Sequence, residues 1–275
     1  MLLVAALVIT AAMAGCDFGD VPEPSLTVNR ANWVQMMIAQ DMSMGALSEY
    51  ELDGIVAEDG GGYITRITVT GRRGTGSQQV VMDTVLGTDI VRNPPAGGNV
   101  NSGDIPQVVL CFQFRIGWTD TMVPPPVQQK CPESASKWPS LAAEQAATID
   151  SAQGLAAIVA TPQLTVPGDR GAALKLLERF GTHALKFDVR QGVPLEPYKA
   201  ELGHALRGLS FASGSGVAAV AMPVVGGGCV YETFTRSDLP RGSNLAWAAP
   251  LDAPCTGVAA LAASGPLSYN PGAGG

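Results

Sequence analysis

The chain has 275 residues, of which 46% are hydrophobic and 15% are charged, and its formal net charge at neutral pH is −7. This length and apolar content allow one large domain or two small domains with packed cores, and they exclude a disordered chain. The acidic balance argues against nucleic acid as a partner, because the phosphate backbone would repel the protein.

The first residues form an apolar leader. Residues 2–15 carry no charged side chain and end in Met13-Ala14-Gly15, directly before Cys16. The stretch is shorter than the ~20 residues that a membrane-spanning helix needs. It has the length of a signal-peptide hydrophobic region, with small residues before the cleavage point. Two alternatives are a buried N-terminal element and an uncleaved membrane anchor.

Met13-Ala14-Gly15-Cys16 resembles the lipobox of bacterial lipoprotein precursors, with Met13 at the position where leucine is usual. The resemblance implies a signal peptide over residues 1–15 and a diacylated, palmitate-type lipid anchor on Cys16. It further implies attachment to the outer face of the cytoplasmic membrane, with residues 16–28 as the lipidated tether. The resemblance covers the leader alone and says nothing about the globular part.

Four further cysteines lie beyond the leader: Cys111, Cys131, Cys229 and Cys255. In an exported protein, four cysteines indicate two disulfides, for which three pairings are possible. The favoured pairing joins Cys111 to Cys131 and Cys229 to Cys255, because each pair is close in sequence and lies within one half of the chain. A metal site would require C-x-x-C spacing or neighbouring histidines, which the sequence lacks. No cofactor is implied.

The first half of the globular part, residues 29–122, predicts one helix followed by antiparallel strands. The helix is predicted over residues 29–46 and ends at Gly45, with an apolar face that holds Trp33, Met36, Met37, Gln40 and Met44. Strand patterns follow over residues 49–58, 63–69, 80–86 and 107–118. In the last of these strands Phe112, Phe114 and Ile116 share one face, and Cys111 lies on the opposite, wetter face.

This order of elements resembles that of the cystatin-like and nuclear-transport-factor-like folds, a likeness that carries no functional residues. A Pro-rich connector over residues 123–139 is expected to separate the first subdomain from a second one. The predicted fold class is therefore α+β, with an N-terminal helix packed on an antiparallel sheet and a second α+β subdomain after it.

The second subdomain spans residues 140–263. Helices are predicted over residues 140–160, 169–180 and 196–209, the second of them between an Asp169 N-cap and a Gly181 stop. Strands are predicted over residues 185–189, 216–225, 228–236, 244–249 and 256–263. The tail, residues 264–275, is expected to be flexible.

Candidate catalytic residues are few. His183 and His204 are the only histidines, and a serine hydrolase would need one of them beside an exposed serine. A helix-end position for His183 and a helix-interface position for His204 are the favoured interpretations, because His204 lies among leucines and alanines at helical spacing.

Three short motifs are candidate functional sites. Ser134–Lys137 matches S-x-x-K, but the partner motifs of penicillin-recognising enzymes are missing. Gly214–Ala219 matches G-x-G-x-x-A, but a strand and not a helix is expected to follow it. Arg72 and Arg73 lie between glycines, where they could bind an anion or simply occupy a hairpin tip.

The sequence favours a non-enzymatic binding or scaffold module of the cell envelope. Its expected partners are the membrane, through the lipid anchor, and another envelope protein or a small ligand. The first alternative is an extracytoplasmic hydrolase that uses His183 or His204. The second alternative is an apolar-ligand carrier, which would have a cavity lined by methionine and phenylalanine between the helix and the sheet.

Overall fold

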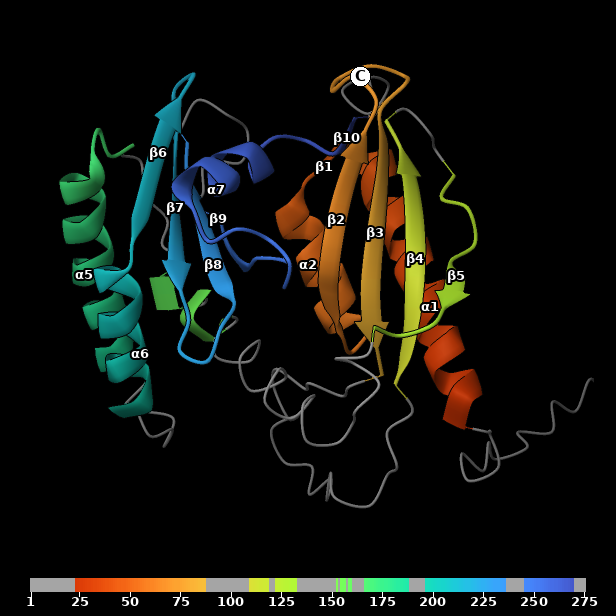
Figure 1. The fold of residues 1–275 in the computed structure, drawn as a ribbon, viewed down its shortest axis with the longest axis horizontal. Coiled ribbons are helices and arrows are strands. Elements are labelled where there is room, and N and C mark those ends of the chain that lie inside the picture. Colours follow the sequence, from red (N-terminus) through yellow and green to blue (C-terminus); the bar gives the residue numbers. More distant parts are fainter. Residues whose placement is uncertain are drawn as a thin grey trace, which may run out of the picture.

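The computed structural model describes residues 23–87, 109–118, 122–132, 152, 154–156, 158–159, 166–187, 196–235 and 245–269. Within them the fold is α+β, with two four-stranded antiparallel sheets that lie side by side and helices packed on both (Figure 1). The predicted fold class is confirmed. The leader, Cys16, and the segments 88–108 and 133–151 lie outside the described residues.

The first sheet has the strand order β2-β3-β4-β5. Its strands are β2 (Tyr63–Thr70), β3 (Gln79–Leu86), β4 (Leu110–Gly117) and β5 (Val127–Gln129). Helix α1 (Glu23–Met44) lies across the back of β3 and β4 (Figure 1). The alternation predicted for β4 is confirmed, since Phe112, Phe114 and Ile116 are buried in the core that α1 covers.

Helix α1 differs from its prediction in both its start and its buried face. It begins at Glu23, so the end of the expected tether is helical, and it ends at Met44 beside the predicted stop Gly45. The buried face holds Ala31, Val34, Ile38 and Met42, whereas Trp33, Met36 and Met44 are each about half exposed. The apolar stripe assigned from the sequence was therefore wrong. Met37 is only partly buried against the core.

The strand pattern read over residues 49–58 is also wrong, because this segment forms helix α2 (Glu49–Glu58). Its first turn is fixed by a capping box. The Ser48 hydroxyl accepts a hydrogen bond from the Glu51 N–H, and the Glu51 carboxylate accepts one from the Ser48 N–H. A local capping motif that satisfies two backbone donors outweighs the residue pattern that suggested a strand.

The Pro-rich connector contributes the edge strand β5, in which Gln129 pairs with Cys111. Cys111 and Cys131 form the predicted disulfide, with a Cα–Cα distance of 5.1 Å. The face of the sheet that carries Cys111 was expected to be the wetter one. It is instead covered locally, because Cys111 packs with Tyr63 and Val85 beneath Leu251.

The second sheet has the order β6-β7-β8-β9 and is sandwiched between helices. Its strands are β6 (Ser210–Gly214), β7 (Val217–Pro223), β8 (Cys229–Phe234) and β9 (Leu245–Ala248). Helices α5 (Arg170–Phe187) and α6 (Glu196–Arg207) pack on one face together with the helical residues 152–159 that are described. Helix α7 (Gly257–Ala263) packs on the other face (Figure 1). The predicted β7–β8 hairpin is confirmed.

Three predictions in this half are wrong: the helix stop at Gly181, the strand from residue 185 and the strand over residues 256–263. Helix α5 starts at the predicted Asp169 cap, whose carboxylate accepts a hydrogen bond from the Ala172 N–H, but it passes through Gly181 and replaces the strand expected from residue 185. A side chain at Gly181 would collide with Leu202 of α6, so this glycine serves close helix packing. Residues 257–263 form helix α7 and not a strand, with Thr256 as its N-cap.

The two halves are joined by segments that cross between them. Strand β1 (Ala46–Leu47) pairs with β10 (Ser268–Tyr269), which lies in the tail that was expected to be flexible. The backbone N–H groups of Leu251 and Asp252 donate hydrogen bonds to the carbonyls of Ile64 and Thr65 on β2. The second half therefore borders the free side of β2.

Candidate functional site

A cleft of about 280 Å³ lies where the two halves meet, and we call it the junction cleft. It is lined by β2, by the segment 250–254 that follows β9, by α7 and by Leu267. Most of this lining is apolar and small. The polar side chains in it are Glu49, Arg66, Arg73, Tyr231 and Asp252.

Glu49 is the buried carboxyl of the cleft. It is the first residue of α2, and its side chain is only 7% exposed. Its Oε1 accepts a hydrogen bond of 3.1 Å from the indole Nε1 of Trp247 on β9. The other carboxylate oxygen, Oε2, accepts no hydrogen bond from the described part of the chain. An acceptor with unused capacity is thus held against an apolar cleft.

Burial raises the pKa of Glu49 to about 7. The Trp247 hydrogen bond opposes this rise because it favours the carboxylate, the negative charge of Asp53 adds to the rise, and the Arg73 guanidinium opposes it. Near neutral pH the Glu49 carboxyl is therefore divided between its charged and neutral forms. It can either accept a hydrogen bond or take up a proton there.

An aromatic cluster forms the wall behind Glu49. The rings of Tyr231 and Trp247 meet edge-to-face with centroids 5.7 Å apart, and Tyr50 meets Trp247 in the same manner at 6.3 Å. The Tyr231 hydroxyl donates a 2.6 Å hydrogen bond to the Pro254 carbonyl, which ties the segment 250–254 to the second sheet. Burial, and then the charge of Glu49, raise the pKa of Tyr231. Tyr231 is therefore a neutral hydrogen-bond donor.

Two arginines line the cleft, one on β2 and one in the turn that follows it. Arg66 forms an ion pair with Asp252, with 3.3 Å between Nε and Oδ2, and lies 3.9 Å from Asp83. Arg73 donates a hydrogen bond of 3.0 Å from Nη1 to the Ala262 carbonyl of α7. No ion pair joins Arg73 to a carboxylate among the described residues, so its charge is offset less than that of Arg66. Of the two arginines singled out from the sequence, Arg73 is the one in the cleft.

The predicted disulfide between Cys229 and Cys255 is confirmed, with a Cα–Cα distance of 5.5 Å. It fixes the end of the segment 250–254 to the first residue of β8. Gly257 then brings the start of α7 against β6, where its N–H donates to the Ser210 hydroxyl at 2.9 Å. Two walls of the cleft are thereby anchored to the second sheet.

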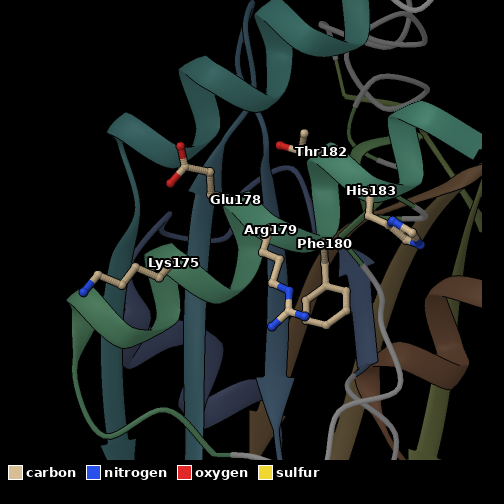
Figure 2. Close-up of a pocket in the computed structure, with 6 residues that line it drawn as sticks. All are labelled: Lys175, Glu178, Arg179, Phe180, Thr182 and His183. Atoms are coloured by element: carbon tan, nitrogen blue, oxygen red, sulfur yellow. The ribbon is translucent and has the colours of Figure 1, made fainter.

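The two histidines are not part of this cleft. His183 lies on the exposed surface of α5 and borders a shallow depression lined by Lys175, Glu178, Arg179, Phe180, Thr182 and His183. Figure 2 shows that these side chains come from one helix and spread in different directions, with Arg179 beside the Phe180 ring. His204 is half-buried on α6, the helix position expected for it. The described residues place no serine–histidine pair in a cleft.

The remaining candidate motifs of the sequence do not form a functional site among the described residues. Gly214–Ala219 forms the β6–β7 turn, where Ser215 and Gly216 have positive φ angles, so the dinucleotide-motif match is a hairpin. Ser134–Lys137 lies outside the described residues. The methionine and phenylalanine side chains that a carrier cavity would use, including Met42, Met82 and Phe114, are buried together in the first core.

A second depression lies between α1, α2 and β9 and is bordered by carboxylates. Its acidic side chains are Asp41, Glu51, Asp53, Glu58 and Asp59. Asp59 accepts a 2.9 Å hydrogen bond from Trp33 Nε1. In the described parts of the chain, no group of three or more histidine, cysteine and acidic side chains is arranged to hold a metal ion.

Sequence reasoning missed Glu49, which lines the cleft, and Trp247, which holds its carboxyl from behind. A partial signal was present, because Ser48-x-x-Glu51 is a capping-box pattern that would have placed a helix start at Glu49. The burial of Glu49 could not be read in the same way, since its partner Trp247 lies 198 residues away.

Comparisons of the chain with protein-family models, with curated proteins and with solved structures find no match. In the described part of the chain, no helix has the length and apolar character required to cross a membrane.

Proposed function

We propose that this chain is an exported lipoprotein, held at the outer face of the cytoplasmic membrane by a lipid on Cys16, and that it acts there as a non-enzymatic binding module. The junction cleft is its binding site. The expected ligand belongs to another envelope component, either a protein segment or a small molecule.

Export is supported by two independent features. The leader resembles a lipobox that ends at Cys16, and the four remaining cysteines form two disulfides. Disulfides persist in oxidising compartments outside the cytosol. Labelling with a radioactive fatty acid tests the anchor, because label should enter the wild-type chain and be absent from a Cys16→Ser variant. An unlabelled wild-type chain would contradict the lipoprotein assignment.

The position of the Glu49 carboxyl is the observation that supports the binding role. Its carboxyl is almost fully buried, it uses one oxygen on Trp247, and it leaves the other open beside an apolar cleft. An acceptor oxygen that faces the cleft, with no hydrogen-bond donor among the described residues, is available to a donor group of a ligand.

In vivo photo-crosslinking tests the cleft. A photoreactive residue at Ile67, which lines the cleft, should give an adduct of defined mass in the envelope. The matched control is the same residue at Met122, which is 80% exposed and does not line the cleft. The adduct should weaken when Glu49→Leu removes the open acceptor. Equal adducts from both positions, or none from Ile67, would contradict the proposal.

An extracytoplasmic hydrolase remains the second candidate, now favoured by Glu49 more than by the histidines. A cleft carboxyl with a pKa of about 7 suits general acid–base chemistry at neutral pH. The test is turnover of ester, amide and glycoside model substrates. Hydrolysis that Glu49→Gln abolishes, and that His183→Ala and His204→Ala leave intact, would favour this enzyme over the binding module.

A further inference from the structure

We propose that the junction cleft binds an extended polypeptide segment, which adds as a strand to the free edge of β2 and places an acidic side chain beside Arg73. This inference rests on the proposed binding function and specifies its ligand. The occupant would be an unfolded stretch of another envelope protein.

The edge of β2 is available by topology. Among the described strands, β2 is the outermost of the first sheet and pairs with β3 alone. A strand at a sheet edge leaves alternate backbone N–H and C=O groups without a ladder partner. Such groups are a template for the addition of another strand.

The chain already adds a short segment to part of this edge. Leu251 and Asp252 donate their backbone N–H groups to the carbonyls of Ile64 and Thr65, at 3.3 Å and 3.0 Å. The register of β2 against β3 shifts between Ile64 and Arg66, which marks a bulge at Thr65. The Thr65 carbonyl therefore points away from β3, toward the cleft side.

Beyond the bulge the strand alternation resumes, so the backbone groups of Ile67 and Val69 point in the same direction as the Thr65 carbonyl. No described residue makes a hydrogen bond to the outward backbone groups of Ile67 or Val69. Both residues line the junction cleft. The cleft therefore continues the edge from the point where Asp252 leaves it.

The walls of the cleft decide what kind of chain can reach this edge. Helix α7 contributes Ala259, Ala262 and Ala263, and the segment 250–254 contributes two prolines. These walls leave about 280 Å³, which admits a short extended segment.

Charge selects among extended segments. The molecule carries a net charge of −7, yet Arg66 and Arg73 both line this cleft. Arg66 forms an ion pair with Asp252, whereas Arg73 forms no ion pair with a described carboxylate and interacts with Glu49 only at longer range. A carboxylate on the incoming segment would complement Arg73. The open oxygen of Glu49 can accept an N–H from the same segment.

The test is selection from a random octapeptide library displayed on phage, against the full mature chain in detergent micelles. Selected peptides should alternate β-branched residues and carry Asp or Glu. Their affinity should fall by about tenfold for Val69→Pro, which removes one edge N–H, and stay within about threefold for Val69→Ala, which keeps it. Arg73→Gln should weaken binding by about fivefold.

Proline is tolerated at an edge position whose N–H faces outward, and formation of both disulfides checks that Val69→Pro has folded. A second measurement needs no protein variant. Methylation of alternate backbone nitrogens in a selected peptide should abolish binding to the wild-type chain in one register only. Strand addition would be overturned if the selected peptides bound Val69→Pro as tightly as the wild-type chain, or if both methylated peptides bound as tightly as the unmethylated one. Failure to select any peptide would also overturn it.

The outcomes separate this inference from the proposed function. If the Ile67 photo-crosslink in cells persists in Val69→Pro, the cleft binds its ligand without strand addition, and only the inference fails. If Ile67 gives no adduct at all, the binding site itself is wrong. A β2-to-β2 dimer of the chain in solution would likewise exclude a peptide occupant.

Discussion

At the scale of single residues, Glu232 has the least favourable surroundings among the described side chains. It lies on β8 between Val220 and Ala246 of the neighbouring strands, is fully buried, and has no hydrogen-bond partner for either carboxyl oxygen. Burial raises its pKa well above the ordinary value. Folding therefore favours the neutral form of this carboxyl.

We expect this residue to lower stability more strongly as the pH rises. Because its pKa is raised on folding, the folded state binds the proton more tightly, so stability is highest below the unfolded pKa of about 4.5 and declines above it. Glu232→Met should raise the free energy of unfolding by about 1–3 kcal/mol at neutral pH. Glu232→Gln should remove the pH dependence while keeping the cost of an unsatisfied polar group. Urea unfolding at several pH values measures both, and a destabilised Glu232→Met would refute the argument.

Glu49 offers a second residue-scale prediction. The Trp247 hydrogen bond stabilises the carboxylate and holds its pKa down, so Trp247→Phe should move the pKa of Glu49 above the value of about 7. Carboxyl-carbon NMR titration reads this directly. The same raised pKa means that Glu49 stabilises the fold at low pH and that this contribution is lost as the pH rises through about 7. Trp33→Phe, which breaks a hydrogen bond to Asp59, is the control and should leave the titration of Glu49 unchanged.

At the scale of elements, Gly257 shows how closely α7 approaches β6. A Cβ at this position would lie 2.4 Å from the Phe211 carbonyl carbon and 2.6 Å from the Ala212 nitrogen, both backbone atoms that cannot rotate away. Gly257→Ala should therefore destabilise the protein by about 1–3 kcal/mol. Gly203→Ala, whose Cβ would meet only the Arg207 side chain at 3.5 Å, should instead stabilise α6 by about 1 kcal/mol. Thermal unfolding compares the two, and equal shifts would contradict the packing argument.

The elements that sequence patterns predicted well are those with a clear period. The alternation of apolar and polar residues predicted β4, and the three consecutive glycines predicted the β7–β8 hairpin. In each case local residues decide the structure. Helices α2 and α7 were missed because their residues are short apolar or mixed runs. Only the capping residues Ser48 and Thr256 distinguish these helices from strands. The junction cleft could not be predicted from sequence patterns, because its lining comes from parts of the chain that are far apart in sequence.

At the scale of the whole molecule, the two disulfides stabilise alike but affect the cleft differently. Their sequence separations are 20 and 26 residues, so removal of either should cost a similar ~3 kcal/mol in the chain-entropy model. Cys229–Cys255 anchors the end of the segment 250–254 covalently, whereas Cys111–Cys131 meets this segment only by packing against Leu251. Replacing Cys229 and Cys255 by alanine should therefore lower the pKa of Glu49 as water enters the cleft, whereas replacing Cys111 and Cys131 should not. Denaturant unfolding and NMR titration together check both halves of this prediction.

Leu267 connects the end of the described chain to the first core. Its N–H donates a 2.7 Å hydrogen bond to the Leu47 carbonyl, its own carbonyl accepts one of 2.8 Å from Gln78, and its side chain is 4% exposed. The segment after α7 is therefore part of the N-terminal core, and Leu267→Ala should cost about 2–4 kcal/mol. Val258→Ala, at a position that is 72% exposed, should change stability by less than about 0.5 kcal/mol. Because Leu267 also lines the junction cleft, amide hydrogen exchange in β2 and β1 should rise in Leu267→Ala while β7 and β8 keep their protection. Uniform loss of protection in both sheets would mean that the two halves unfold as one unit. Leu267 would then stabilise the whole molecule and not only the first core.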